Sequence, residues 1–185
     1  MEDVRPATYE DLFHLPETVV GEIIGGELHA HPRPRPRHAD TSSAINVFIR
    51  GPFHHGRGGP GGWRIIVEPE LHLEADILVP DLAGWRRETL PALPETAWFE
   101  TVPDWVCEVL SPATVRHDRL RKLPRYAAHG VAWCWLVDPD SQTIEVFRLS
   151  GGEWVLAANA VGTEGEAALP PFDAVPLPLA DLWGA

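Results

Sequence analysis

A run of six residues, Trp105–Leu110, constrains the fold of this chain more than any other segment. It reads Trp-Val-Cys-Glu-Val-Leu and contains one polar residue, Glu108. Because side chains alternate between the two faces of a strand, an apolar run without alternation is typical of a strand covered on both faces. The run therefore predicts a strand that is buried on both faces.

Glu108 makes the same run chemically unusual. Whichever face its side chain takes, its neighbours two positions away are Val106 and Leu110. A buried carboxylate without a partner costs several kcal/mol or becomes protonated. Glu108 is therefore expected to lie beside a metal ion or an ammonium group.

The rest of the sequence predicts short elements in the order helix, hairpin, helix, three strands, helix, strands. In residue numbers these are a helix at Thr8–Leu15, a hairpin at Glu22–Ala30 that turns at Gly25-Gly26, a helix at His38–Arg50, a loop at Gly51–Gly62, strands at Trp63–Val67, Ala75–Trp85 and Trp105–Leu110, a helix at Thr114–His129 interrupted at Pro124, and strands at Ala132–Asp138, Thr143–Leu149 and Trp154–Ala158. This order predicts an α/β (α+β) fold built on one mixed sheet.

A length of 185 residues suits a single domain. Within it we expect an N-terminal helix and hairpin at 1–37, a core at 38–150, and a C-terminal strand and tail at 151–185. Proline at every second position from Pro32 to Pro36 predicts an extended connector between the first two parts.

The charge of the chain excludes one broad class of protein. With 15 basic and 27 acidic residues, the formal net charge is −12, which argues against a generally basic, phosphate-coating surface but leaves room for a local basic groove. No apolar run approaches the ~18 residues that a membrane span requires. The acidic residues 1–11 lack the apolar stretch of a signal peptide, so we expect a cytoplasmic protein.

Two further residues stand out chemically. Asp81 follows a proline inside an apolar run, so its carboxylate either reaches solvent at a strand end or lies near a cation. Lys122 is the one lysine beside 14 arginines, which suggests a position that needs a compact ammonium group. Asp118 lies four residues before Lys122, and the alternative interpretation is a surface ion pair on one helix face.

Two acids on successive strands and a lysine on the next helix can support metal-assisted hydrolysis of a phosphodiester. Carboxylates are the ligands that Mg²⁺ prefers. The metal would polarise the phosphate and acidify a bound water. The ammonium group would neutralise charge that develops on the phosphoryl oxygens.

The same residues belong to a longer series of motifs. In order they are Glu22–Leu28 in the hairpin, His38 at the start of a helix, Val79–Asp81, Glu108–Thr114, Asp118, Lys122, Tyr126, Gly130-Val131 and Trp135–Pro139. This series resembles the Uma-two family of restriction-endonuclease-like proteins, within the PD-(D/E)XK nuclease superfamily, and covers the chain from about Thr8 to Trp183. The resemblance implies a restriction-endonuclease-like core, in which a central mixed sheet is flanked by helices, and metal ligation by Asp81 and Glu108.

The sequence departs from the superfamily pattern in two places. The lysine that usually stands two residues after the strand acid is replaced by Leu110, so its role is assigned to Lys122 on the following helix. Gly25 occupies a hairpin position that is often acidic in the family.

Four more residues are candidates for the same cleft. Glu22 is the third acid expected near the metal, with a surface position at the hairpin edge as the alternative. His38 either reaches the cleft or only begins a helix. Asp118 is a further cleft candidate, and Tyr126 is expected to pack and to form a hydrogen bond rather than to react.

Basic residues around Lys122 are candidates for contacts to a nucleic-acid backbone. They are Arg116, Arg119, Arg121 and Arg125, and solvated helix charge is the alternative. The pairs His29/His31 and His54/His55 have no Cys or Glu at zinc-site spacing, so we interpret them as exposed loop histidines.

These observations predict a Mg²⁺- or Mn²⁺-dependent endonuclease that hydrolyses nucleic acid, most readily DNA, and that could act as a homodimer. Alanine at Asp81 or Lys122 is expected to abolish cleavage and to leave thermal stability largely intact. Leu110, Gly25 and the negative net charge favour an alternative, a catalytically inactive binding or assembly protein with a nuclease fold. A phosphatase-like hydrolase of a small phosphate ester is a third possibility. A Lys122 side chain that points away from the acids would favour the inactive protein.

Overall fold

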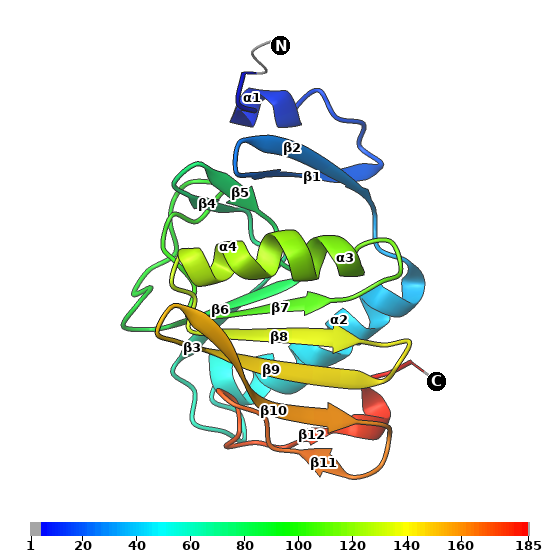
Figure 1. Cartoon of the computed structure of the whole chain (residues 1–185). Coiled ribbons are helices and arrows are strands. Elements are labelled where there is room, and N and C mark those ends of the chain that lie inside the picture. The colour runs from blue at the N-terminus through cyan, green and yellow to red at the C-terminus, as the bar shows by residue number, and fades with distance from the viewer. Residues whose placement is uncertain (1–4, 185) are drawn as a thin grey trace.

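A six-stranded mixed sheet forms the centre of the fold (Figure 1). The structure is a computed structural model and describes residues 5–184; residues 1–4 and 185, which the one-domain prediction includes, lie outside the described residues. Across the sheet the strands are β10 (Glu153–Val161), β9 (Thr143–Ser150), β8 (Trp133–Asp138), β7 (Trp105–Val109), β6 (Leu82–Arg86) and β3 (Trp63–Val67). Strands β7 and β8 are parallel, and the other neighbours are antiparallel.

Helices cover both faces of this sheet, as the family resemblance implies. Helix α2 (Pro36–Ile49) lies behind it in Figure 1, and the crossover from β7 to β8 lies in front. The crossover consists of α3 (Val115–His117), a π-helical turn η2 (Asp118–Lys122) and α4 (Leu123–Ala128). Every residue of β7 is buried. Its alternate residues pack into two cores, one with Ile45 and Ile49 of α2 and the other with Tyr126 of α4.

A smaller four-stranded sheet lies above the central one in Figure 1. Its order is β2 (Glu27–Pro32), β1 (Val19–Ile24), β5 (Asp76–Leu78) and β4 (Leu71–Leu73). The hairpin of β1 and β2 turns at Gly25 and Gly26, whose φ angles of 60° and 80° suit glycine in a two-residue turn. The remaining elements are α1 (Tyr9–Leu12), the π-helical turn η1 (Arg50–His54), β11 (Glu166–Ala167), β12 (Leu177–Pro178) and η3 (Leu179–Asp181).

The predicted α+β architecture with a central mixed sheet is confirmed, with corrections to single elements. The predicted strand Ala75–Trp85 is two strands, β5 and β6, which belong to different sheets. The break falls at Pro80, which has no amide hydrogen for a strand ladder. The predicted loop Gly51–Gly62 begins with helical turn η1, and strand β4 escapes sequence prediction. The interruption at Pro124 is confirmed, because this residue lies in the first turn of α4.

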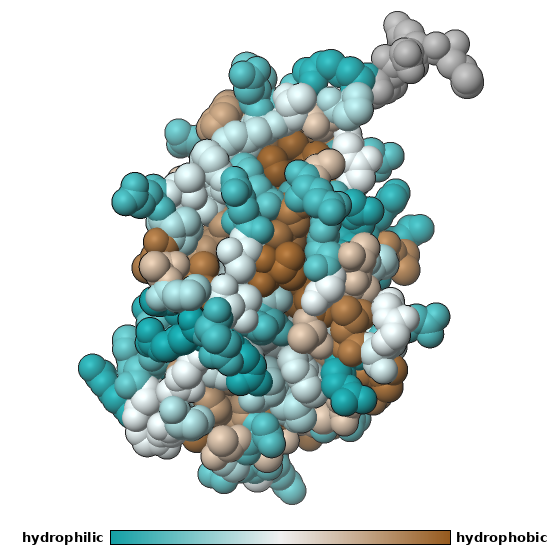
Figure 2. All heavy atoms as spheres, turned by 90° about the vertical axis from the view of Figure 1, so that its left-hand side faces the viewer, coloured by the Kyte–Doolittle hydropathy of each residue, from teal (hydrophilic) through white to brown (hydrophobic). Residues whose placement is uncertain are grey.

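The outer surface is mixed in character. Figure 2 shows the side at the left of Figure 1, where hydrophilic residues cover most of the face and apolar residues gather in a narrow strip in its upper half. Among residues 5–184, no helix has the length and apolar character needed to cross a membrane.

Candidate functional site

The ammonium group of Lys122 is the centre of a buried charged cluster. Its Nζ lies 2.7 Å from Oε1 of Glu108 and 2.9 Å from Oε1 of Glu22, and it donates a hydrogen bond to the carbonyl of Val79 at 3.0 Å. The side chain of Lys122 is only 4% exposed. The predicted alternative, a surface ion pair with Asp118, is therefore wrong, since both residues are buried.

Asp81 and Glu108 come from neighbouring strand segments. Leu82 pairs with Cys107 in the antiparallel ladder of β6 and β7, so one further step along the ladder sets Asp81 opposite Glu108. The carboxylate of Asp81 accepts a hydrogen bond from the backbone N–H of Val109 at 2.7 Å. Its other oxygen lies 3.3 Å from Nε2 of His38, at the start of α2. Asp81 is thus fixed at the end of the central sheet, and His38 contacts it there from the start of α2.

Glu108 is satisfied by donors from the crossover segment. The hydroxyl of Tyr126 donates a hydrogen bond of 2.6 Å to Oε1, the same oxygen that Lys122 contacts. The expectations of an ammonium partner for Glu108 and of a packing, hydrogen-bonding role for Tyr126 are both confirmed. Burial raises the pKa of Glu108 and outweighs the opposing effect of Lys122.

The remaining acids of the cluster differ in their protonation behaviour. Burial works to raise the pKa of Glu22, but Lys122, His117 and the backbone N–H of Val79 together lower it to about 2. Burial raises the pKa of Asp118 to about 6, and the ammonium group of Lys122 opposes this shift. The neighbouring carboxylates in turn raise the pKa of Lys122 above its ordinary value although burial acts to lower it. The cluster therefore holds several carboxylates around one ammonium group, an environment that favours a further cation.

One cavity of about 400 Å³ collects most of the predicted site residues. Its charged and imidazole-bearing lining residues include Glu22, His31, His38, Asp81, Glu108, Asp118 and Lys122. The π-helical turn η2 contributes the last two of these from its two ends, and π-helical turns are frequent at functional sites. The lysine therefore points toward Glu22 and Glu108 and not away from the acids.

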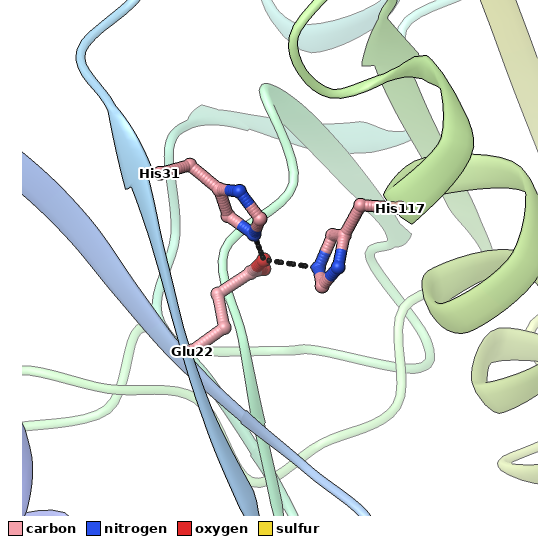
Figure 3. A group of neighbouring side chains, drawn as sticks. All are labelled: Glu22, His31 and His117. Atoms are coloured by element: carbon pink, nitrogen blue, oxygen red, sulfur yellow. Dashed lines mark hydrogen bonds and ion pairs between the residues drawn. The ribbon is translucent and has the colours of Figure 1, made fainter.

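A second group of side chains meets at Glu22 (Figure 3). Oε2 of Glu22 lies 3.2 Å from Nε2 of His117 and 3.9 Å from Nε2 of His31. Among residues 5–184, these three form the one group of His, Cys, Asp or Glu residues, three or more in number, whose ligand atoms all lie within 4.8 Å of one another.

This group corrects the interpretation of His29 and His31 as exposed loop histidines. Both lie on β2 with partly buried side chains, 19% and 20% exposed, on the face that the crossover segment covers. Sequence analysis missed His117 altogether. For the histidines of β2, the available signal is the register of the hairpin. It sets His29 opposite Glu22, and His31, two residues further along β2, on the same face.

The arginines around Lys122 take two different positions. Arg119 pairs with Glu145, and Arg125 lies 2.6 Å from the buried carboxylate of Asp76. Arg116 and Arg121 are exposed. The structure thus separates two arginines that join elements of the fold from two that face solvent.

The fold is a central mixed sheet flanked by helices. Carboxylates from β1 and from the ends of β6 and β7 lie around a lysine of the crossover. Together these features define a nuclease-like class of protein. Residues 7–180 match the model of the family Uma2, described as "Putative restriction endonuclease". The chain belongs to this family. The family resemblance predicted from sequence is therefore confirmed.

A solved structure supports the fold assignment. It is described as a "putative nuclease belonging to DUF820" from Anabaena variabilis, and it is 24% identical to this chain. The similarity covers 96% of this chain and 98% of that one, with a TM-score of 0.71. No curated protein matches the sequence. At this level of identity, the likeness establishes the nuclease-like fold.

Proposed function

We propose that this protein is a divalent-metal-dependent endonuclease that hydrolyses phosphodiester bonds of nucleic acid. The observation that carries the proposal is the position of Lys122, whose ammonium group lies 2.7 Å from Glu108 and 2.9 Å from Glu22 in a cavity that Asp81 also lines. Membership of the Uma2 family supports the same class of activity.

Asp81 and Glu108 would hold the metal ion. Their fit to Mg²⁺ or Mn²⁺ is supported by donor chemistry, because both offer hard carboxylate oxygens to one cavity and Mg²⁺ is commonly bound by one or two carboxylates plus water and phosphate. The contacts of Glu108 with described residues are made by Oε1, so Oε2 is available as a ligand. When bound, the ion would polarise the scissile phosphate and acidify a coordinated water.

The neighbouring side chains would position the reacting groups. Lys122 would lie close to the phosphate and stabilise the charge that develops on its oxygens. Glu22 holds Lys122 from the side of the small sheet. His38 and the backbone N–H of Val109 hold the carboxylate of Asp81 in one orientation. Preorganised contacts of this kind reduce the reorganisation that catalysis requires.

We further propose DNA as the substrate, with Arg116 and Arg121 as backbone contacts. Both are exposed and lie on the crossover segment that also carries Lys122. Arg119 and Arg125 are already engaged with carboxylates, so their loss would affect the fold more than binding. A homodimer would allow two such sites to cut two strands, and light scattering of the purified protein tests this directly.

The decisive test is cleavage of supercoiled plasmid DNA, and in parallel of single-stranded RNA, with Mg²⁺ or Mn²⁺. Asp81→Asn and Glu108→Gln are expected to reduce the rate by roughly 100-fold or more. The matched controls Asp173→Asn and Glu88→Gln, at exposed positions, should cleave like the wild type. Equal cleavage by the wild type and Asp81→Asn would refute the assignment. No cleavage of either nucleic acid would favour the non-catalytic binding protein.

Calorimetric titration with Mg²⁺ separates metal binding from turnover. Saturable binding by the wild type, lost in Asp81→Asn and in Glu108→Gln, is the expected result. Mg²⁺ is the appropriate probe because it selects carboxylate oxygens over imidazole. Binding that persists in both variants would place the metal elsewhere.

A further inference from the structure

We propose that Glu22, His31 and His117 form a second metal site, which takes an imidazole-preferring transition metal such as Zn²⁺. The site is distinct from the proposed Mg²⁺ position at Asp81 and Glu108. Three elements supply its ligands: β1 supplies Glu22, β2 supplies His31 and α3 supplies His117 (Figure 3).

The separations of the ligand atoms fit a four-coordinate ion. Zn²⁺ binds imidazole nitrogen and carboxylate oxygen at about 2.0–2.2 Å, so neighbouring ligands in a tetrahedron lie roughly 3.3–3.5 Å apart. Oε2 of Glu22 lies 3.2 Å from His117 and 3.9 Å from His31. The ligand atoms of the two histidines lie within 4.8 Å of each other. The two rings already lie with centroids 4.1 Å apart, and binding of the ion would bring Nε2 of His31 closer to Oε2 of Glu22.

The polar atoms of this group are not fully used by the protein. Nε2 of His31 is buried and has no hydrogen-bond partner among the described residues, although it is 3.9 Å from the carboxylate. The side chain of Glu22 is 3% exposed and that of His117 is 10% exposed. A buried polar atom without a partner is costly, and a metal ion bound at Nε2 would satisfy it.

The two carboxylate oxygens of Glu22 divide the cluster into two sites. Oε1 accepts the ammonium group of Lys122 and the backbone N–H of Val79, whereas Oε2 faces the two histidines. The metal and Lys122 would thus lie on different sides of one carboxylate. Lys122 also contacts Oε1 of Glu108 at 2.7 Å, so Glu22 is not its one acidic partner.

The donor set determines which metal fits. Two imidazoles and one carboxylate suit Zn²⁺ and other first-row transition metals, whereas Mg²⁺ prefers oxygen ligands alone. Glu22 and His31 also line the cavity of about 400 Å³, so the fourth position can hold a water that is reached from that cavity. A bound ion would in addition connect the β1–β2 hairpin to the crossover segment. Its ligands Glu22 and His117 are 95 residues apart in the sequence.

The test is a calorimetric titration of the full-length, metal-free protein with Zn²⁺ in the presence of excess Mg²⁺. We expect one Zn²⁺ per chain. Loss of an outer contact to a metal ligand lowers metal affinity by roughly 10–100-fold. Because His31→Gln and His117→Gln each remove a ligand itself, each should lower Zn²⁺ affinity by more than this. The wild-type melting temperature should rise with Zn²⁺, and this rise should be absent in both variants, whose metal-free melting curves report whether they fold.

Two controls separate this site from its surroundings. His29→Gln removes the neighbouring imidazole, which lies with its ring centroid 5.0 Å from that of His117 and outside the ligand group, and should bind Zn²⁺ like the wild type. Asp81→Asn should also bind Zn²⁺ normally, even though it is expected to lose Mg²⁺ binding and cleavage. Equal binding by folded His31→Gln and by the wild type, or equal losses in His29→Gln and His31→Gln, would overturn the proposal and leave the proposed nuclease activity untouched.

Discussion

Burial changes what a substitution of Lys122 is expected to do. From sequence alone, alanine at this position is expected to remove activity and to spare stability. In the structure the ammonium group is 4% exposed and joins two carboxylates that are themselves buried. Removal of one partner from a buried ion pair leaves an uncompensated charge in an environment of low polarity. The stability expectation therefore holds better for the more accessible Asp81 than for Lys122.

Lys122→Met is accordingly expected to lower the free energy of unfolding by about 3–5 kcal/mol. Urea denaturation at pH 7.5 measures this change. The adjacent exposed Arg121 provides the control, since Arg121→Met should change stability by no more than about 0.5 kcal/mol. Equal stabilities of the two variants would contradict the view that Lys122 neutralises buried carboxylates.

Substitution of Asp118 should raise stability, whereas substitution of Lys122 should lower it. The pKa of Asp118 is raised from 3.8 to about 6, so the folded protein holds this proton more tightly than the unfolded chain does. Its contribution to stability is therefore lost as the pH rises from 3.8 through about 6, and at pH 7.5 the ionised group costs up to about 3 kcal/mol. Asp118→Asn should be more stable than the wild type at pH 7.5 by about 1–3 kcal/mol.

The pH dependence of this gain is the check on its cause. Urea denaturation at pH 7.5 and at pH 4.5 should show the advantage of Asp118→Asn narrowing at the lower pH, where the wild-type carboxyl is protonated in the fold. A variant that is less stable than the wild type at both values would show that Asp118 stabilises the folded protein as a carboxylate.

Among the elements, Asp76 of β5 has a joining role that no sequence pattern reveals. Its fully buried carboxylate accepts a hydrogen bond from the hairpin turn at Gly25, 2.8 Å away, and contacts Arg125 and His129 at 2.6 Å each. One side chain thus joins the hairpin, β5 and the end of the crossover. The same contact gives Arg125, one of the predicted nucleic-acid contacts, a structural partner in Asp76.

Asp76→Asn is expected to weaken the connection between these elements and so to lower the free energy of unfolding. The amide keeps a group that can accept from Gly25 but leaves Arg125 and His129 without a carboxylate partner. Because Arg125 is 37% exposed, the cost should be about 2–3 kcal/mol, below the roughly 3–5 kcal/mol of a fully buried pair. Thermal unfolding measures this cost, with Asp173→Asn at an exposed position as the matched control. Equal melting temperatures would disprove the joining role.

At the scale of the whole molecule, local patterns predict the frame of the site better than its contents. The apolar run of β7 and the Gly25-Gly26 turn are local signals, and both features are confirmed. The contact of Glu22 with His117 spans 95 residues and depends on how the small sheet packs against the crossover, which no local pattern specifies. Sequence therefore predicts Asp81, Glu108 and Lys122 as neighbours from their elements, but not the histidine group beside them.

The packing of the two cores leads to a prediction about cooperativity. Val106 and Leu136 of the central sheet share one core with Ile24 and Leu78 of the small sheet, while alternate residues of the same central strands face the other core. The small sheet thus shares much of its apolar packing with the central sheet.

We therefore expect residues 5–184 to unfold in a single transition, in agreement with the one-domain proposal. Loss of the small sheet would expose part of a core that the central sheet also needs, so neither part should persist without the other. Differential scanning calorimetry of the metal-free protein should give one peak, with a calorimetric enthalpy equal to the van't Hoff enthalpy. Two resolved peaks, or a van't Hoff enthalpy well below the calorimetric one, would instead indicate that the hairpin region forms a separate unit docked on the nuclease-like core.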